Sequence, residues 1–488
     1  MAHFQLSFLF APVFKFTRAV LFHTAFTRHM SGLVYVRATV AIVALSLTIS
    51  VASAQSDFAT KFDTNESISP DFISLIFGPP LDAEHNGPVE MNLSDETLED
   101  ELSGIRLADN MAVKNSKKTL KLTPEQLQRQ SRIARCLSMY FRMPVVAEKW
   151  RPWTIMHGLL PYGQLSRVES KGQHYYAVDY LCHNQIGNDT QMLHLSGSKL
   201  GVSVGPGVQG HEGQFLAMLA QADVPITHPI YIHGKKFTVE DLIEYEKRGC
   251  KQFTELTFKL IGLSHYVSAD EIWKSKVGQS WNIERLIHEE IRQPINGAAC
   301  GGTHRLMGLS YAIKMRADSG KPVDGEWARA KKYIGQYQDF ALQFQNSDGS
   351  FSTNWFVTQE AESDLKKRLY TTGHIVEWLA FSLPDEKLHD PKFTRAVDYL
   401  VELMLTAPSL DLEIGPKGHA IHALRLYEQR VFGANSNVEE ITPADLAIVE
   451  KAMIQQKHMK PEFESPTAQP VSFPGSGTPG IRRSFRRR

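Results

Sequence analysis

Histidines recur in one sequence context along this 488-residue chain. Glycine–histidine pairs open the segments GHEGQFLAMLAQ, GHIVEWLAFSL and GHAIHALRLYEQ, and a threonine precedes the histidine of THRLMGLSYAIK. The four histidines are His211, His374, His419 and His304. Imidazole titrates near neutral pH, so it can act as a general acid, a general base or a metal ligand. The alternative is structural, with each ring filling space and bonding the neighbouring turn.

The spacing of these segments predicts a structural repeat. A unit of about 45 residues fits if one copy without histidine lies between His211 and His304. The segment FTELTFKLIGLSHY at 253–266 has the right character, with Thr254 and Glu255 in the place of the histidine. The longer gap between His304 and His374 predicts an inserted loop, 347–372.

Helices of two kinds must position these residues. The histidine segments are apolar on most sides, which is typical of buried helices, and they alternate with charge-rich segments that have one apolar face. Buried helices alternating with solvent-facing ones predict two concentric rings. Six inner helices are expected, near His157, His211, Glu255, His304, His374 and His419. The outer helices are expected at 238–248, 282–291, 327–344, 391–405 and 443–456.

Local signals predict three further elements. Thr123, Pro124 and Gln126 form a helix-start pattern, so a helix is expected from Pro124 to about Met139. Alternating aromatic residues at 173–182 predict a β-hairpin, and the glycine-rich stretch 197–210 predicts a loop.

The two ends of the chain predict export and a basic tail. The apolar run 39–51 follows Arg37 and precedes an A-x-A site ending at Ala54, which is typical of a secretory signal, and translation from Met30 would give a signal of ordinary length. We therefore expect a leader and signal at 1–54, a disordered linker at 55–121, a folded domain at 122–458 and a disordered basic tail at 459–488. The protein is expected to be exported, periplasmic or extracellular, and its tail could touch anionic surfaces.

The cysteines leave the redox state open. Cys136, Cys182, Cys250 and Cys300 could form up to two disulfides in an oxidising compartment, in any of three connectivities, or remain four buried thiols. The absence of a CxxC pair argues against a structural zinc finger.

The alternating helices, the Gly-His pairs and the turn QNSDGSF at 345–351 together resemble a known superfamily. The turn is similar to the QxxDGSW-type turns of terpenoid cyclases, and the whole pattern resembles the α/α toroids, which include those cyclases, protein prenyltransferase β subunits and, with the same barrel, polysaccharide lyases and glycosidases. The resemblance implies an all-α toroid of about six inner and six outer helices, with a small β-hairpin insertion.

The resemblance leaves the chemistry open. The chain lacks the DxDD motif with which triterpene cyclases protonate their substrate. Prenyltransferases hold zinc with an Asp-x-Cys pair and a later histidine; Cys300 and His374 could imitate two ligands, but Ala298 replaces the aspartate. No cofactor is expected otherwise.

In a toroid the inner helices run parallel, so their N-termini would meet at one mouth. His211, His304 and His374 are the catalytic candidates there, with His157 and His419 as ligand-binding partners. The helix dipoles should lower the pKa of the imidazoles. Glu212 and Glu377 are the carboxylates expected to orient His211 and His374. Trp355, on the inserted loop, could stack on a sugar or cover an apolar ligand.

Three functions remain possible. The first is an exported lyase or hydrolase that acts on a polysaccharide or another extended, anionic ligand. The second is a non-catalytic binding or scaffold protein of the cell envelope, and the third is isoprenoid chemistry of the cyclase or prenyltransferase kind. The formal net charge is zero, so composition gives no reason to expect a nucleic-acid partner.

Overall fold

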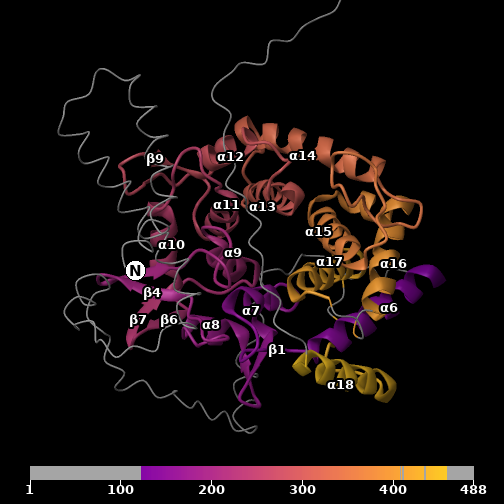
Figure 1. Cartoon of the computed structure of the whole chain (residues 1–488). Helices are drawn as coiled ribbons and strands as arrows, with labels where there is room; N and C mark the ends of the chain where they lie inside the picture. Colours follow the sequence, from indigo (N-terminus) through magenta and orange to yellow (C-terminus); the bar gives the residue numbers. More distant parts are fainter. Residues whose placement is uncertain (1–121, 407, 409–411, 434–435, 459–488) are drawn as a thin grey trace, which may run out of the picture. The chain divides into compact units, whose positions relative to one another are not determined.

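The computed structural model describes residues 122–406, 408, 412–433 and 436–458, all within a compact unit that spans Asn115–Arg488. Helices dominate this unit, and small β-hairpins join some of them (Figure 1). The predicted signal, linker and basic tail lie outside the described residues. Within the described part of the chain, no helix is both long and apolar enough to cross a membrane.

Six helices have mostly buried residues. Each packs against the next in the chain, and the last packs against the first, so their contacts close into a cycle (Figure 1). In order they are α7 (Pro152–Leu159), α9 (Gln214–Gln221), α11 (Thr257–Tyr266), α13 (Thr303–Asp318), α15 (Leu365–Ser382) and α17 (Ile414–Phe432). These are the segments predicted to be inner helices. Every side chain of α9 from Gln214 to Ala220 is buried, which explains its apolar sequence.

The charge-rich helices pack outside this cycle (Figure 1). Helix α14 buries only Trp327, Ala330, Ile334 and Ala341, which lie on one face, against α13 and α12. Helix α10 packs on α9 and α11, and α16 packs on α15, α17 and α6. The outer helices are α6 (Pro124–Phe141), α10 (Val239–Arg248), α12 (Ile283–Ile291), α14 (Gly325–Gln343), α16 (Pro391–Thr406) and α18 (Pro443–His458).

The helix-start patterns form the caps that the sequence predicts. The Thr123 side chain accepts from the Gln126 N–H at 3.3 Å, and the Gln126 side chain accepts from the Thr123 N–H at 2.9 Å. Thr238 forms the equivalent box at the start of α10, and Asn282 caps α12. These caps satisfy N–H groups that have no partner inside the helix.

The strands form one small sheet and three hairpins. Strand β2 (Arg167–Ser170) lies between β1 (Val145–Val146), which is parallel to it, and β3 (Gln173–Tyr176), which is antiparallel with Val168 opposite Tyr175. The hairpins pair β4 (Leu193–Ser196) with β5 (Lys199–Val202), β6 (Pro229–Ile232) with β7 (Lys235–Thr238), and β8 (Trp273–Lys274) with β9 (Ser280–Trp281).

Two local predictions were partly wrong. Only the first four residues of the predicted hairpin 173–182 are a strand; Ala177–Cys182 forms the short helix α8. Its side chains at Val178, Leu181 and Cys182 are buried on one side, which favours a helical turn over alternation. The predicted loop 197–210 contains β5, whose Leu200 and Val202 are buried.

The Gly-His pairs do not all mark helix starts. Helix α15 begins at Leu365, capped by Asp364, so Gly373 and His374 lie in its interior and the inserted loop ends earlier than predicted. Helix α17 begins at Ile414, which puts His419 beyond its first turn. The glycines are there for helix contact instead, because a Cβ on Gly418 would lie 2.5 Å from the His157 carbonyl oxygen.

The four cysteines are free thiols. Three are buried, while Cys300 is partly exposed. The disulfides that an oxidising compartment would allow are therefore not formed among the described residues.

Candidate functional site

Five histidines from five elements gather at the centre of the helix cycle. The centroids of the His374 and His419 rings lie 3.9 Å apart, with the ring planes tilted by 32°. His304 lies 5.3 Å from His374 and 5.4 Å from His419. His157 reaches His419 at 5.4 Å, and His211 reaches His304 at 6.0 Å. We call these five residues the histidine cluster. Their rings lie together as predicted, but the side chains of His157, His304, His374 and His419 are buried instead of lining an open mouth.

Burial keeps three members of the cluster neutral. It lowers the pKa of His157 to about 3, an effect reinforced by the nearby His419. Burial also lowers the pKa of His304 and of His374 well below the usual value, with further contributions from neighbouring imidazoles. The expected cause was the helix dipole, but His374 lies in a helix interior, where the dipole has little effect. These three rings offer no positive charge to a ligand.

His211 is oriented by Glu255, which the sequence analysis named only as the residue that replaces the histidine in its repeat. The ring lies in the turn before α9, and its Nδ1 donates to Glu255 Oε2 at 2.7 Å. The expected partner, Glu212, lies instead 3.3 Å from Lys259 Nζ. The His211 side chain is 12% exposed and that of Glu255 35%, so this pair forms the solvent-accessible edge of the cluster.

Glu377 orients His419, not His374 as expected. Its Oε2 accepts from His419 Nδ1 at 2.8 Å, and its Oε1 accepts from His422 Nδ1 at 2.6 Å. Burial opposes ionisation of this carboxylate, but His419 and the two hydrogen bonds outweigh burial and lower the pKa of Glu377. Glu377 of α15 therefore binds two histidines of α17, His419 inside the cluster and His422 outside it.

Backbone carbonyls fix two more rings. Nδ1 of His374 lies 2.7 Å from the Tyr370 carbonyl oxygen, and Nδ1 of His157 lies 2.7 Å from that of Trp153. Since a carbonyl only accepts, each Nδ1 carries the proton and each Nε2 is left as an acceptor or ligand atom.

His304 differs from the other four members, because neither of its ring nitrogens has a hydrogen-bond partner although both are buried. Ligand atoms of His304, His374 and Cys300 all lie within 4.8 Å of one another. The Tyr370 hydroxyl donates to Cys300 Sγ at 3.2 Å. Burial raises the pKa of the Cys300 thiol to about 12.

The inserted loop brings Trp355 to the cluster. Its ring centroid lies 6.0 Å from that of His374 and 5.3 Å from that of Tyr370. A Cβ on Gly301 would lie 2.0 Å from the Trp355 ring, so glycine is required for this contact. Asp348 of the same loop accepts from the Ser350 N–H and hydroxyl and pairs with Arg368, which assigns it to the turn.

The residues that sequence reasoning missed lie one helical turn from residues that it found. Tyr370 and Trp153 stand four positions before His374 and His157, and His422 stands three after His419. Neighbours at these spacings share a helix face. Reading that face around each histidine would have found all three.

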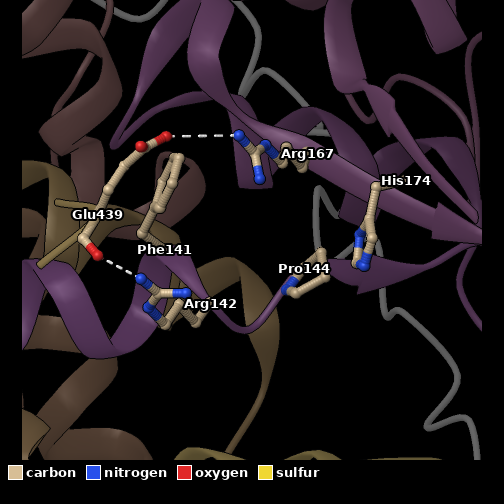
Figure 2. Close-up of a pocket in the computed structure, with 6 residues that line it drawn as sticks. All are labelled: Phe141, Arg142, Pro144, Arg167, His174 and Glu439. Atoms are coloured by element: carbon tan, nitrogen blue, oxygen red, sulfur yellow. Dashed lines mark hydrogen bonds and ion pairs between the residues drawn. The ribbon is translucent and has the colours of Figure 1, made fainter. Parts of the chain in front are cut away.

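A further pocket lies away from the histidine cluster (Figure 2). It has a volume of about 410 Å³ and contains no predicted site residue. Its two arginines are both engaged by one loop residue: Arg142 donates to the Glu439 carbonyl oxygen, and Arg167 lies 3.5 Å from the Glu439 carboxylate (Figure 2). The lining residues are Phe141, Arg142, Pro144, Arg167, His174 and Glu439.

No family model, curated protein or solved structure matches this chain. The chemistry of the histidine cluster is therefore inferred from its own atoms.

Proposed function

We propose that this protein is an exported α/α-toroid enzyme that cleaves a polysaccharide, as a lyase or hydrolase, at the histidine cluster. The closed cycle of six buried helices, with charge-rich helices packed outside it, supports the toroid arrangement. Export is supported by the apolar run 39–51 and its A-x-A site.

The observation that carries the proposal is the His211–Glu255 pair. A general base needs an imidazole whose second nitrogen is oriented by an acceptor, and it must be reachable by substrate. Nδ1 of His211 donates a hydrogen bond to Glu255 at 2.7 Å, which leaves Nε2 free to accept a proton. Both side chains are partly exposed, which supports access of a substrate to the pair.

Aromatic rings around the histidine cluster favour a sugar substrate. Phe253 stands two residues before Glu255 and is 61% exposed, although a large apolar side chain would ordinarily be covered. The Trp355 ring lies near His374, and the Trp153 and His157 rings are tilted against each other with centroids 3.9 Å apart. Exposed and half-buried aromatic rings on several sides of a polar centre are suited to stacking on successive sugar rings.

The same base serves either reaction. In a lyase, Nε2 of His211 removes the proton next to a uronate carboxylate, and the electron pair expels the glycosidic oxygen, which takes a proton from an acid. In a hydrolase, Nε2 takes a proton from the water that attacks the anomeric carbon, the bond from that carbon to the glycosidic oxygen breaks, and the oxygen takes a proton from an acid. A lyase also needs a cation to neutralise the uronate, but Lys259, which binds the neighbour of His211, Glu212, is also held by Glu246.

A panel of uronate-containing and neutral polysaccharides tests the proposal, with absorbance of unsaturated product and reducing ends as readouts. His211→Ala and Glu255→Gln should each lower kcat/KM at least about 100-fold, the range expected for a lost general base. Glu212→Gln is the matched control, because its carboxylate faces Lys259, and it should retain activity. Silence across the panel, or full activity of His211→Ala, would leave the non-catalytic scaffold as the better reading, to be tested by glycan binding.

Isoprenoid chemistry is the second candidate, favoured by the proximity of Cys300 and His374. Binding or turnover of a prenyl diphosphate, lost in Cys300→Ser and retained in Glu255→Gln, would favour it over polysaccharide cleavage.

A further inference from the structure

We infer that Cys300, His304 and His374 form a binding site for a transition metal ion of the zinc class. The three residues come from η3 (Ala299–Gly302), α13 and α15, and their ligand atoms lie within 4.8 Å of one another. A thiolate with two imidazoles is a donor set that suits zinc.

His304 is the residue that points to a ligand. Its side chain is nine-tenths buried, and neither ring nitrogen has a partner among the described residues. Leaving a buried polar group without a hydrogen bond costs about 1–3 kcal/mol. Every other member of the histidine cluster has its Nδ1 paired with a carboxylate or a backbone carbonyl. A metal ion would give His304 the partner that the protein does not.

Tyr370 supports two of the three ligands at once. Its carbonyl oxygen accepts from His374 Nδ1 at 2.7 Å, which fixes the tautomer that presents Nε2 to a metal. Its hydroxyl donates to Cys300 Sγ at 3.2 Å, a hydrogen bond that favours a thiolate. Ligating residues are ordinarily oriented by such outer hydrogen bonds.

The backbone conformation at Cys300 also supports a ligand role for this residue. Cys300 has a left-handed conformation with φ 50° and ψ 42°, and it is followed by Gly301 and Gly302 with φ 60° and 84°. A left-handed non-glycine residue costs about 1–2 kcal/mol. This turn directs the thiol to Tyr370 and places His304 one turn later, at the start of α13.

Binding requires a small contraction. Zinc–ligand bonds of about 2.0–2.3 Å set tetrahedral ligand atoms roughly 3.3–3.8 Å apart, so the side chains must close by about 1 Å. Three protein ligands leave a fourth position for water or substrate, as in catalytic zinc sites. The His211 ring lies 6.0 Å from that of His304, and Glu377 and Glu255 would offset the added charge.

This site stands apart from the proposed function, since a metal could bind here whether or not a polysaccharide is cleaved. If the site is correct, His304 and His374 are ligands, and His211 remains the base. Metal content and glycan turnover are separate measurements, so either proposal can fail without the other.

The test loads the metal-free full chain with Co²⁺ and with Zn²⁺. We expect one equivalent of Co²⁺, a thiolate-to-cobalt charge-transfer band, and a Zn²⁺-dependent rise in Tm. Cys300→Ser should abolish the band, and His304→Leu should weaken binding at least tenfold. Tyr370→Phe should weaken it about tenfold, as outer hydrogen bonds do. Cys250→Ser is the control, because that thiol is buried against the Glu246 carbonyl and should leave the band unchanged.

Two results would overturn the inference. One is wild-type protein that binds no stoichiometric Co²⁺ and shows no Zn²⁺-dependent rise in Tm. The other is a metal that binds but whose affinity and spectrum are unchanged in Cys300→Ser and His304→Leu. The wild-type measurements decide the matter even if a variant fails to fold.

Discussion

Two adjacent residues at the start of α13, His304 and Arg305, belong to two very different clusters of buried polar side chains. His304 faces the histidine cluster with no hydrogen-bond partner, whereas Arg305 enters a network in which every group is paired. Arg305 donates to Glu290 at 3.0 Å, to the Pro294 carbonyl at 2.6 Å and to Gln293 at 3.0 Å. Glu290 also accepts from the Leu256 N–H and the Thr257 hydroxyl.

The difference in hydrogen bonding indicates that the network around Arg305 has a structural role and the histidine cluster a functional one. The network of Glu290 and Arg305, which we call the Glu290 network, is complete without any ligand and ties α12 to α11 and α13. A complete buried network stabilises one arrangement of helices, while an incomplete one leaves a cost that only a ligand removes. His304 is therefore one point at which the described part of the fold departs from maximum stability.

Breaking the Glu290 network should have the largest effect. Arg305→Met keeps the apolar stem but leaves Glu290 as an unpaired buried carboxylate, so the free energy of unfolding should fall by about 3–5 kcal/mol in a urea titration. Lys314→Met is the matched control on the same helix, because its pair with Asp318 is exposed and should be worth less than about 0.5 kcal/mol. An Arg305→Met protein as stable as the control would remove the structural role of the network.

Acid should weaken the cluster and spare the network. Burial lowers the pKa of His157 to about 3, below its unfolded value of about 6.5, so the unfolded chain binds the extra proton between these values. Stability is therefore full above pH 6.5 and falls as the pH drops, by up to about 1.4 kcal/mol per pH unit for one such group. Between pH 6.5 and 4.5 this amounts to roughly 2–3 kcal/mol, measured by denaturant titration at each pH.

Two variants sharpen that measurement. His157→Gln, which can still donate to the Trp153 carbonyl, should have a smaller slope of stability against pH. Lys314→Met, whose ion pair with Asp318 is exposed, should keep the wild-type slope. Equal slopes in wild type and His157→Gln would mean that His157 does not enter the fold as a neutral ring.

The contact between Trp355 and the turn at Cys300 should have an intermediate effect. Gly301→Ala adds a Cβ 2.0 Å from the Trp355 ring at a residue with φ 60°, so it should lower stability by about 1–2 kcal/mol. Gly297→Ala separates the clash from the backbone cost, since Gly297 has φ 84° and open space around its Cβ position. Thermal unfolding of both variants should show the larger loss at Gly301; equal losses would mean that Trp355 moves aside freely.

The sequence predicted the buried helices and the convergence of their histidines, because apolar periodicity and caps such as Thr123 are local signals. The sequence analysis placed two helix starts wrongly. Glycine occurs both at helix boundaries and at close contacts between helices, and Gly373 and Gly418 are of the second kind. The sequence analysis also gave His211 and His374 the nearest carboxylates in the chain, Glu212 and Glu377. The actual partner of His211, Glu255, comes from a neighbouring repeat, and only the folded helix cycle brings such residues together.

The smallest expected effect is the most direct test of the comparison. His304→Leu removes two buried nitrogens that have no partner and keeps an apolar side chain, so metal-free protein should be equally stable or about 1 kcal/mol more stable. His419→Leu is the counterpart inside the same cluster, and it should destabilise, because Glu377 loses one of its two imidazole donors. Urea titration in the presence of a chelator compares the two. If His304→Leu were as damaging as His419→Leu, His304 would be paired in solution, and the distinction between the incomplete cluster and the complete Glu290 network would be lost.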